Sequence, residues 1–222
     1  VANLAGVPES AIKIAAAVED PRPHPRLKLE RARALRACYQ APAAEVELRS
    51  LTGLQDPETL VPALLELAQV ARLVPHPYVS PQDALRQAET AAQGQPEPLH
   101  TQSLHLITAA RAALAVLDAD PSAAPEELSA LCLDWTAPTA LVLGAQASRC
   151  QLLALEGRTG EAQKEAAELW ERLRQVHSLP LTTGSEILSG VLCTHVMCAE
   201  PGQALAMLNQ ANGVRYLEHH LS

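Results

Sequence analysis

The stretch that decides the fold is AQASRCQLLALEGRTGEAQKEAAELWERLRQV, residues 145–176. Apolar and small residues recur every three or four positions on both sides of Gly157, which is the spacing of one face of an amphipathic helix. Gly157 and Gly160 interrupt this spacing, as glycines do in turns. The stretch therefore predicts two antiparallel helices, 138–155 and 161–176, joined by a short connection.

Four places along the chain resemble the start of the same short helix. Each has a turn residue and an acid or amide just before a small or apolar residue, at positions 81–84, 125–128, 160–162 and 201–204. The steps between Ala84, Leu128, Ala162 and Ala204 are 44, 34 and 42 residues. Repetition at such a period is typical of stacked helix pairs, in which no pair can bury its apolar face alone. The sequence therefore predicts an all-α protein of stacked antiparallel helix pairs, an α-solenoid.

The regularity of the pattern divides the chain into two parts. Residues 1–78 are predicted to form irregular N-terminal helices with a Pro-rich linker at 20–25, and residues 79–222 to continue from them as regular helix pairs. Asp56 and Ser80 have the side chains that cap helix N-termini. The predicted helices are 11–18, 26–39, 43–51, 57–73, 84–92, 99–117, 125–133, 138–155, 161–176, 185–199 and 202–211.

Composition excludes several function classes. The chain of 222 residues has a formal charge of −8, no Phe and only 2 Trp, so both the charge and the aromatic platforms of a nucleic-acid binder are missing. No run approaches 18 consecutive apolar residues, so no transmembrane helix is expected. The five Cys are widely spaced and odd in number, which favours reduced thiols and a cytoplasmic or nuclear location. The chain begins with Val1, and we expect it to be a fragment or subunit of a larger assembly.

One candidate for a metal site is Cys193, His195 and Cys198, which have the residue types that bind zinc. On a helix, however, Cys198 and His195 would point about 140° and 200° away from Cys193, so the three cannot converge on one ion. A nucleophile elbow and a phosphate-binding loop are also absent from the sequence. The sequence therefore predicts no metal, no cofactor and no catalytic residue, and an enzyme would need a site assembled from scattered residues.

One basic stretch, residues 22–36, stands out in this acidic chain. It holds five arginines and a lysine against Glu30 alone. Three interpretations remain open: an ordinary polar helix face, a docking surface for an acidic partner, and a contact with nucleic acid, which the lack of interleaved aromatic residues argues against. The residues assigned to a docking surface are Arg26, Arg33 and Arg36.

Residues 145–176 resemble a tetratricopeptide repeat, a helix–turn–helix unit of about 34 residues. The residues that carry the resemblance are Cys150, Leu153, Gly157, Ala162, Ala166 and Leu169. A small residue at Ala162 is expected to let the second helix approach the first near Cys150. The resemblance implies a right-handed superhelix, whose concave face is lined by the first helix of each pair and grips a peptide or helix of a partner protein.

Polar residues within the apolar pattern of those first helices are the predicted partner-binding residues, because a surface kept open for recognition explains them. They are Gln102, His105, Gln146, Arg149 and His195, and Lys164 and Glu165 are assigned to the opposite, outer face. The leading function is a non-catalytic interaction scaffold or adaptor with a protein or peptide partner. The alternatives are a regulatory helical domain of a larger enzyme or transcription factor, and an all-helical enzyme.

Overall fold

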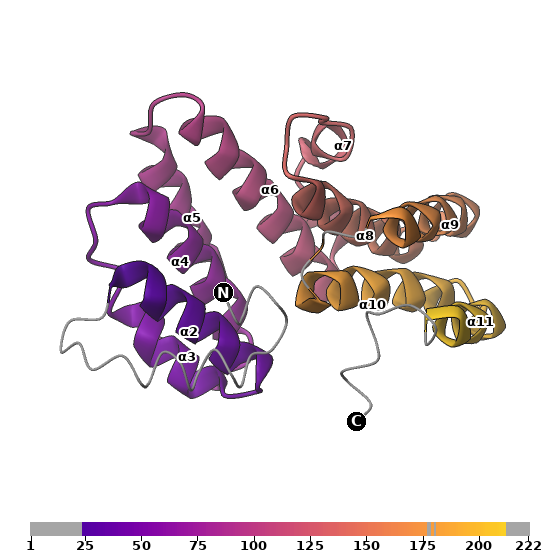
Figure 1. Cartoon of the computed structure of the whole chain (residues 1–222), viewed down its shortest axis with the longest axis horizontal. Coiled ribbons are helices and arrows are strands. Elements are labelled where there is room, and N and C mark those ends of the chain that lie inside the picture. Colours follow the sequence, from indigo (N-terminus) through magenta and orange to yellow (C-terminus); the bar gives the residue numbers. More distant parts are fainter. Residues whose placement is uncertain (1–23, 177–178, 180, 212–222) are drawn as a thin grey trace. The chain divides into compact units, whose positions relative to one another are not determined.

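The computed structural model describes residues 24–176, 179 and 181–211, and this part of the chain is entirely helical (Figure 1). It confirms the predicted all-α fold. The elements are α2 (Pro25–Ala37), α3 (Ala41–Arg49), α4 (Pro57–Ala71), α5 (Pro81–Gln93), α6 (Leu99–Leu117), the 3-10 turn η1 (Pro121–Ala123), α7 (Leu128–Leu131), α8 (Thr139–Leu155), α9 (Thr159–Gln175), α10 (Leu181–Met197) and α11 (Pro201–Ala211).

Helix starts follow the predicted capping residues. Asp56 accepts a hydrogen bond from the backbone N–H of Glu58, and Ser80 accepts one from that of Asp83 at 3.0 Å. His24 caps α2, so the last residue of the predicted linker at 20–25 begins a helix, and residues 20–23, like the predicted helix 11–18, lie outside the described residues.

The bounds of several helices differ from the prediction by one to four residues, as α7 and α10 illustrate. α7 covers only Leu128–Leu131, because the residues from Pro125 form a turn instead of a helical start. α10 begins at Leu181, four residues before the predicted start, and continues through Gly184. Both differences arise where Pro or Gly stands near a helix end, which is where sequence patterns fix boundaries least well.

The chain forms two compact units, and the division falls inside α6, after Ile107. Unit 1 ends at Ile107 and unit 2 begins at Thr108. The boundary predicted near residue 78 marked where the pattern becomes regular, and it does not coincide with this division.

In unit 1, α2, α3 and α4 pack against one another, and α5 packs against α4. Their core is aliphatic, with Leu48, Leu51 and Leu67 almost fully buried. Asp56 and Ser80 fix where α4 and α5 begin, so the two aliphatic helix faces meet in register.

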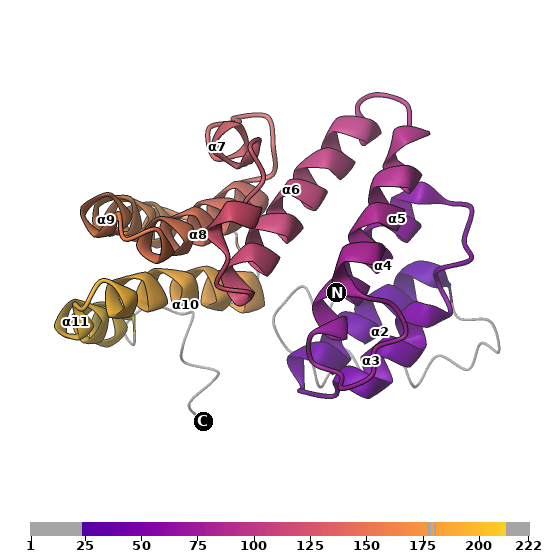
Figure 2. The same ribbon diagram turned by 180° about the vertical axis from the view of Figure 1, so that it is seen from behind.

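In unit 2, α8 and α9 form the antiparallel pair that the sequence predicts, and α10 packs against both. Figures 1 and 2 show α10 alongside α8 and α9, with α11 beside α10. Ala166, Leu169 and Trp170 of α9 share one buried cluster with Cys150 of α8. The sequence predicted that Ala162 lets α9 approach α8 near Cys150. Ala162 instead belongs to a cluster with Leu153 and Cys198, and the small residue of α9 in the cluster of Cys150 is Ala166.

The approach of α10 to α8 depends on a glycine. A Cβ atom at Gly190 would lie 3.0 Å from Cβ of Ala147 and 3.2 Å from Nε2 of Gln151. Gln151 also donates a hydrogen bond to the carbonyl oxygen of Gly190, at 3.2 Å. Any side chain at this position would therefore push the two helices apart.

Four helices end with the same pattern of backbone hydrogen bonds. After α8, the N–H of Gly157 bonds to the carbonyl of Ala154 and the N–H of Arg158 to that of Leu153, which is a Schellman cap. Gly157 has φ of 79°, as this cap requires. Equivalent positions after α2, α6 and α10 also have positive φ but hold Tyr39, Ala119 and Ala199.

Candidate functional site

A depression of about 350 Å³ lies between α8 and α9 and beside the residues that follow α7. Its apolar residues are Cys132, Leu133, Cys150 and Leu169. Its polar residues are Gln146 and Arg149 of α8, and Glu161, Lys164, Glu165, Glu168 and Arg172 of α9. Leu169 and the two cysteines are buried, so the depression has an apolar floor and a charged rim.

Gln146 holds the depression together through both ends of its amide. Its Nε2 donates to the carbonyl oxygen of Cys132 at 2.9 Å, which ties the segment after α7 to α8. Its Oε1 accepts a hydrogen bond from Nη1 of Arg172 at 2.8 Å, which places that guanidinium on the rim. Gln146, predicted to bind a partner directly, thus positions other groups of the site.

Arg149 forms an ion pair with Glu165, with 3.0 Å between Nη2 and Oε1. This contact and the one between Gln146 and Arg172 step along α8 and α9 in opposite directions, as antiparallel helices require. Glu165 and Lys164 line the same depression as Gln146 and Arg149, so their assignment to the opposite, outer face was wrong. The error arises because the sequence alone does not show which face of α9 is turned toward α8.

The charges of the rim are incompletely paired. Glu165 is neutralised by Arg149, and Glu161 by Arg158, which donates to both of its carboxylate oxygens. Lys164 and Arg172 have no acidic partner within the part of the chain that the structure describes, and Glu168 has no basic one. The unpaired charges of the rim are therefore two cations and one anion.

The two thiols on the floor are neutral at physiological pH. Burial raises the pKa of Cys132 to about 11 and that of Cys150 to about 12, and the nearby Glu165 adds to the effect on both. A thiol must ionise to act as a nucleophile or to bind a metal, so these two cysteines serve neither purpose at neutral pH. What the depression offers is an apolar floor beside hydrogen-bond donors, a combination suited to binding.

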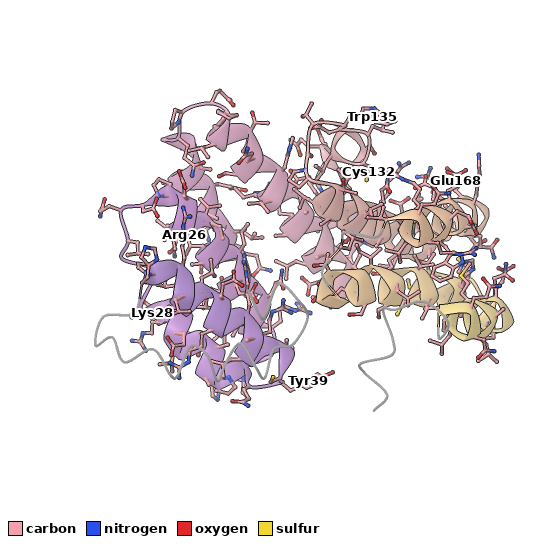
Figure 3. All side chains as sticks on the ribbon, viewed as in Figure 1. Arg26, Lys28, Tyr39, Cys132, Trp135 and Glu168 are labelled. Atoms are coloured by element: carbon pink, nitrogen blue, oxygen red, sulfur yellow. The ribbon has the colours of Figure 1, made fainter. Side chains whose placement is uncertain are left out.

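An exposed apolar segment joins α7 to α8 at the edge of the depression. Leu133 lines the depression and is 71% exposed, and Trp135, two residues further on, is 97% exposed. Figure 3 shows Trp135 projecting from this segment, which also carries Cys132. Oδ1 of Asp134 accepts hydrogen bonds from the backbone N–H of Thr136 at 2.8 Å and from its hydroxyl at 2.7 Å. This Asx turn holds the backbone on either side of Trp135.

Of the other predicted partner-binding residues, His195 is not on a surface. Its side chain is 2% exposed, whereas the sequence predicted that it would face an open groove. Neither ring nitrogen has a hydrogen-bond partner among the described residues, although Nδ1 lies 3.5 Å from Oε2 of Glu200. His195 follows the buried Leu188 and Val191 at helical spacing, which is the signal that could have placed it in the core.

Gln102 and His105 lie on the part of α6 that belongs to unit 1, and they do not line the depression. Gln102 is exposed and His105 is half-buried. The structure thus brings together only two of the five residues predicted on the first helices, Gln146 and Arg149.

The arginines of the basic stretch that the structure describes are paired within unit 1. Arg26 contacts Glu58 at 2.8 Å, Arg31 contacts Glu47 at 3.2 Å, and Arg33 contacts Glu30 at 2.6 Å. Arg33 and Arg36 also share Glu66, which is buried. The acids come from α3 and α4 as well as from Glu30, so this surface carries less available charge than its sequence indicates.

No group of three or more His, Cys, Asp and Glu side chains could hold a metal ion in the described part of the chain. Cys193 is exposed while Cys198 and His195 are buried, so these three side chains are in different environments. None of the helices in the described ranges is both long and apolar enough to cross a membrane.

Trp135 and Leu133 were missed by the sequence analysis, which followed helical periodicity and treated the residues between helices as connections. The available signal was a tryptophan between Asp134 and Thr136, a pair able to form an Asx turn. Comparisons of this chain with protein-family models, with curated proteins and with solved structures find no match.

Proposed function

We propose that this protein is a non-catalytic interaction scaffold or adaptor that belongs to a larger complex and binds a protein or peptide partner. The observation that carries this proposal is the pairing of a fully exposed tryptophan with the depression beside it. Tryptophan and arginine are the residues that most often dominate protein interfaces, and Trp135 and Arg172 both lie at this site. A chain gains nothing in stability from a tryptophan that is 97% exposed, so a partner is its best explanation.

We further propose that the helix pairs stack in the manner of tetratricopeptide repeats. The packing of α10 on both α8 and α9 supports this arrangement, because in such a stack the first helix of one pair rests on both helices of the preceding pair. The five free cysteines support a reducing compartment, the cytoplasm or the nucleus.

A photo-cross-linking experiment tests the scaffold proposal. Benzoylphenylalanine replaces Trp135 in one variant and Tyr39 in another, and each protein is irradiated in an extract of cells that normally express it. Tyr39 is a matched control because it is also aromatic and 96% exposed, but its segment, unlike the one that carries Leu133 and Trp135, contributes no residue to the depression. We expect a discrete cross-linked protein from position 135 that is missing from position 39.

The same bands from both positions, or none from position 135, would contradict the scaffold proposal at this site. Circular dichroism of both variants establishes that they are folded before irradiation.

A further inference from the structure

We propose that the depression and the segment after α7 bind a linear peptide of a partner protein that carries an acidic side chain next to an apolar one. In this arrangement Arg172 and Lys164 bind the carboxylate, and Leu133 and Trp135 cover the apolar side chain. The inference rests on the proposed function and specifies the chemistry of the partner.

The charge of the rim selects an acidic group. The chain as a whole has a formal charge of −8, yet the unpaired charges of this rim are two cations and one anion. In unit 1, by contrast, each of Arg26, Arg31, Arg33 and Arg36 already contacts an acid. Arg172 and Lys164 are thus cations beside an open depression that form no ion pair with an acid in the described part of the chain, and Glu168, one helical turn from each, is the single unpaired anion beside them.

Arg172 is also correctly presented for a carboxylate. A guanidinium has five N–H donors in a fixed fork, and the hydrogen bond from Nη1 of Arg172 to Gln146 uses one of them. Gln146 is neutral, so it orients the guanidinium without cancelling its charge. The remaining donors are available for the two oxygens of a carboxylate, the geometry in which arginine binds most strongly.

The apolar half of the peptide is accommodated by the floor and the adjoining segment. Cys132 and Cys150 are neutral, so they repel no carboxylate, and together with Leu169 they form an apolar surface. Leu133 and Trp135 both stand on the segment after α7 and are largely exposed, so both are available to cover an apolar side chain of the peptide. A volume of about 350 Å³ suits a few side chains of a peptide.

Nucleic acid fits this site less well. Lys164 and Arg172 are enough to bind one carboxylate, whereas a nucleic-acid backbone needs many cations to neutralise its run of phosphates. Single-stranded nucleic acid also needs several aromatic side chains on which bases can stack, and Trp135 is the one exposed aromatic residue of unit 2 in its described ranges.

The test begins with a phage-displayed library of random peptides selected on the intact chain. We expect enrichment of peptides with Asp or Glu within two positions of Leu, Ile, Phe or Trp. A fluorescein-labelled copy of the most enriched peptide then gives affinities by anisotropy, beside a version with Lys in place of its acids and a labelled oligo-dT strand.

The variants separate the site from the rest of α9. Arg172→Ala should weaken binding about tenfold, since it removes a charged hydrogen-bonding partner. Arg174→Ala is the matched control, being the same residue type two positions away, outside the depression and paired with Glu171. It should change the affinity less than twofold. Lys164→Ala and Trp135→Ser should each weaken binding, and Glu168→Gln should strengthen it. Thermal melts establish that each variant is folded.

Three results would overturn the inference: enrichment of basic peptides, tighter binding of oligo-dT than of the peptide, or equal losses from Arg172→Ala and Arg174→Ala. Basic peptides whose binding is lost in Trp135→Ser would contradict only the acidic chemistry and leave the scaffold proposal standing. A library that yields no peptide, together with no cross-link at position 135, would contradict both.

Discussion

The two units hold their helices together by different means. In unit 1, ion pairs add to the aliphatic core that joins α2 to its neighbours, and Arg33 and Arg36 both reach the buried Glu66 of α4. In unit 2, α10 meets α8 where Gly190 faces Ala147, so that small residues allow close approach. The described arginines of α2 in unit 1 are thus paired with acids of the same unit, while Lys164 and Arg172 of α9 in unit 2 form no ion pair with a described acid.

This difference shows that the density of charge along a sequence is a poor guide to the charge available to a partner. The basic stretch is the most cationic part of the chain, yet its arginines from Arg26 onward are paired with acids of unit 1. Lys164 and Arg172 stand in an acidic helix and form no ion pair with any acid that the structure describes. Availability depends on which acids the fold brings close, and that is a property of packing.

The largest effect is expected from Glu66→Ala, which breaks the ionic contact of unit 1. The substitution would leave Arg33 and Arg36 facing a buried position with no acid, and it would also open a cavity. Losing one partner of a buried ion pair costs several kcal/mol, and partial exposure of both arginines reduces this to about 3 kcal/mol. Urea unfolding measures it. A loss below about 0.5 kcal/mol would mean that ion pairs do not hold α2 to α4.

A smaller loss is expected from Gly190→Ala in unit 2. The new methyl group would meet Ala147 at 3.0 Å, and we expect a net cost of about 1–2 kcal/mol after the gain in helix propensity. Gly144→Ala in α8 is the matched control, because nothing lies within 4 Å of its added Cβ. The control should gain about 0.5–1 kcal/mol. If both variants were stabilised, α10 would not approach α8 as closely as described.

The buried thiols of unit 2 predict a loss of stability in alkali. The pKa values of Cys132 and Cys150 are raised in the folded state, so the folded protein keeps these protons after the unfolded chain has begun to lose them. Their contribution is complete below about pH 9 and falls as the pH rises toward 11 to 12, by about 1 kcal/mol per thiol near pH 10. The measurement is the urea midpoint at several pH values, with Cys132→Ala/Cys150→Ala as control. An identical pH profile for this control would show that the thiols are not responsible.

The smallest effects are expected at the left-handed caps. Ala119→Gly and Ala199→Gly should each stabilise the protein by less than about 1 kcal/mol, since relief of the strained φ outweighs the greater freedom of glycine in the unfolded chain. Gly157→Ala should destabilise it by a similar amount. Thermal melts rank the three variants. A stabilising effect of Gly157→Ala would contradict the cap after α8.

Much of the fold could be predicted from the sequence because helices are local. The limits of α6 match the predicted 99–117, and Asp56 and Ser80 cap the helices that follow them. Apolar spacing and capping residues are sufficient for this, since both act within a few residues along the chain.

The site was predicted only in part, because it depends on which helix faces meet. Gln146 and Arg149 were identified, but their partners on α9 were assigned to another surface. A polar residue in an apolar pattern is either open to a partner or buried, and His195 shows that the pattern alone does not distinguish them. Trp135 has no helical periodicity and gave no such signal.

The amide of Gln146 couples two properties that would otherwise vary independently: the anchoring of the segment that carries Trp135, and the free charge of Arg172. Glutamate in its place differs by little more than an oxygen for a nitrogen. A glutamate at position 146 would, however, repel the carbonyl oxygen of Cys132 and neutralise the guanidinium of Arg172. One deamidation would therefore weaken the anchoring of the segment after α7 and also prevent Arg172 from binding an acidic group. Binding at this surface is therefore sensitive to deamidation of a single side chain, Gln146, although the glutamate formed has almost the same shape.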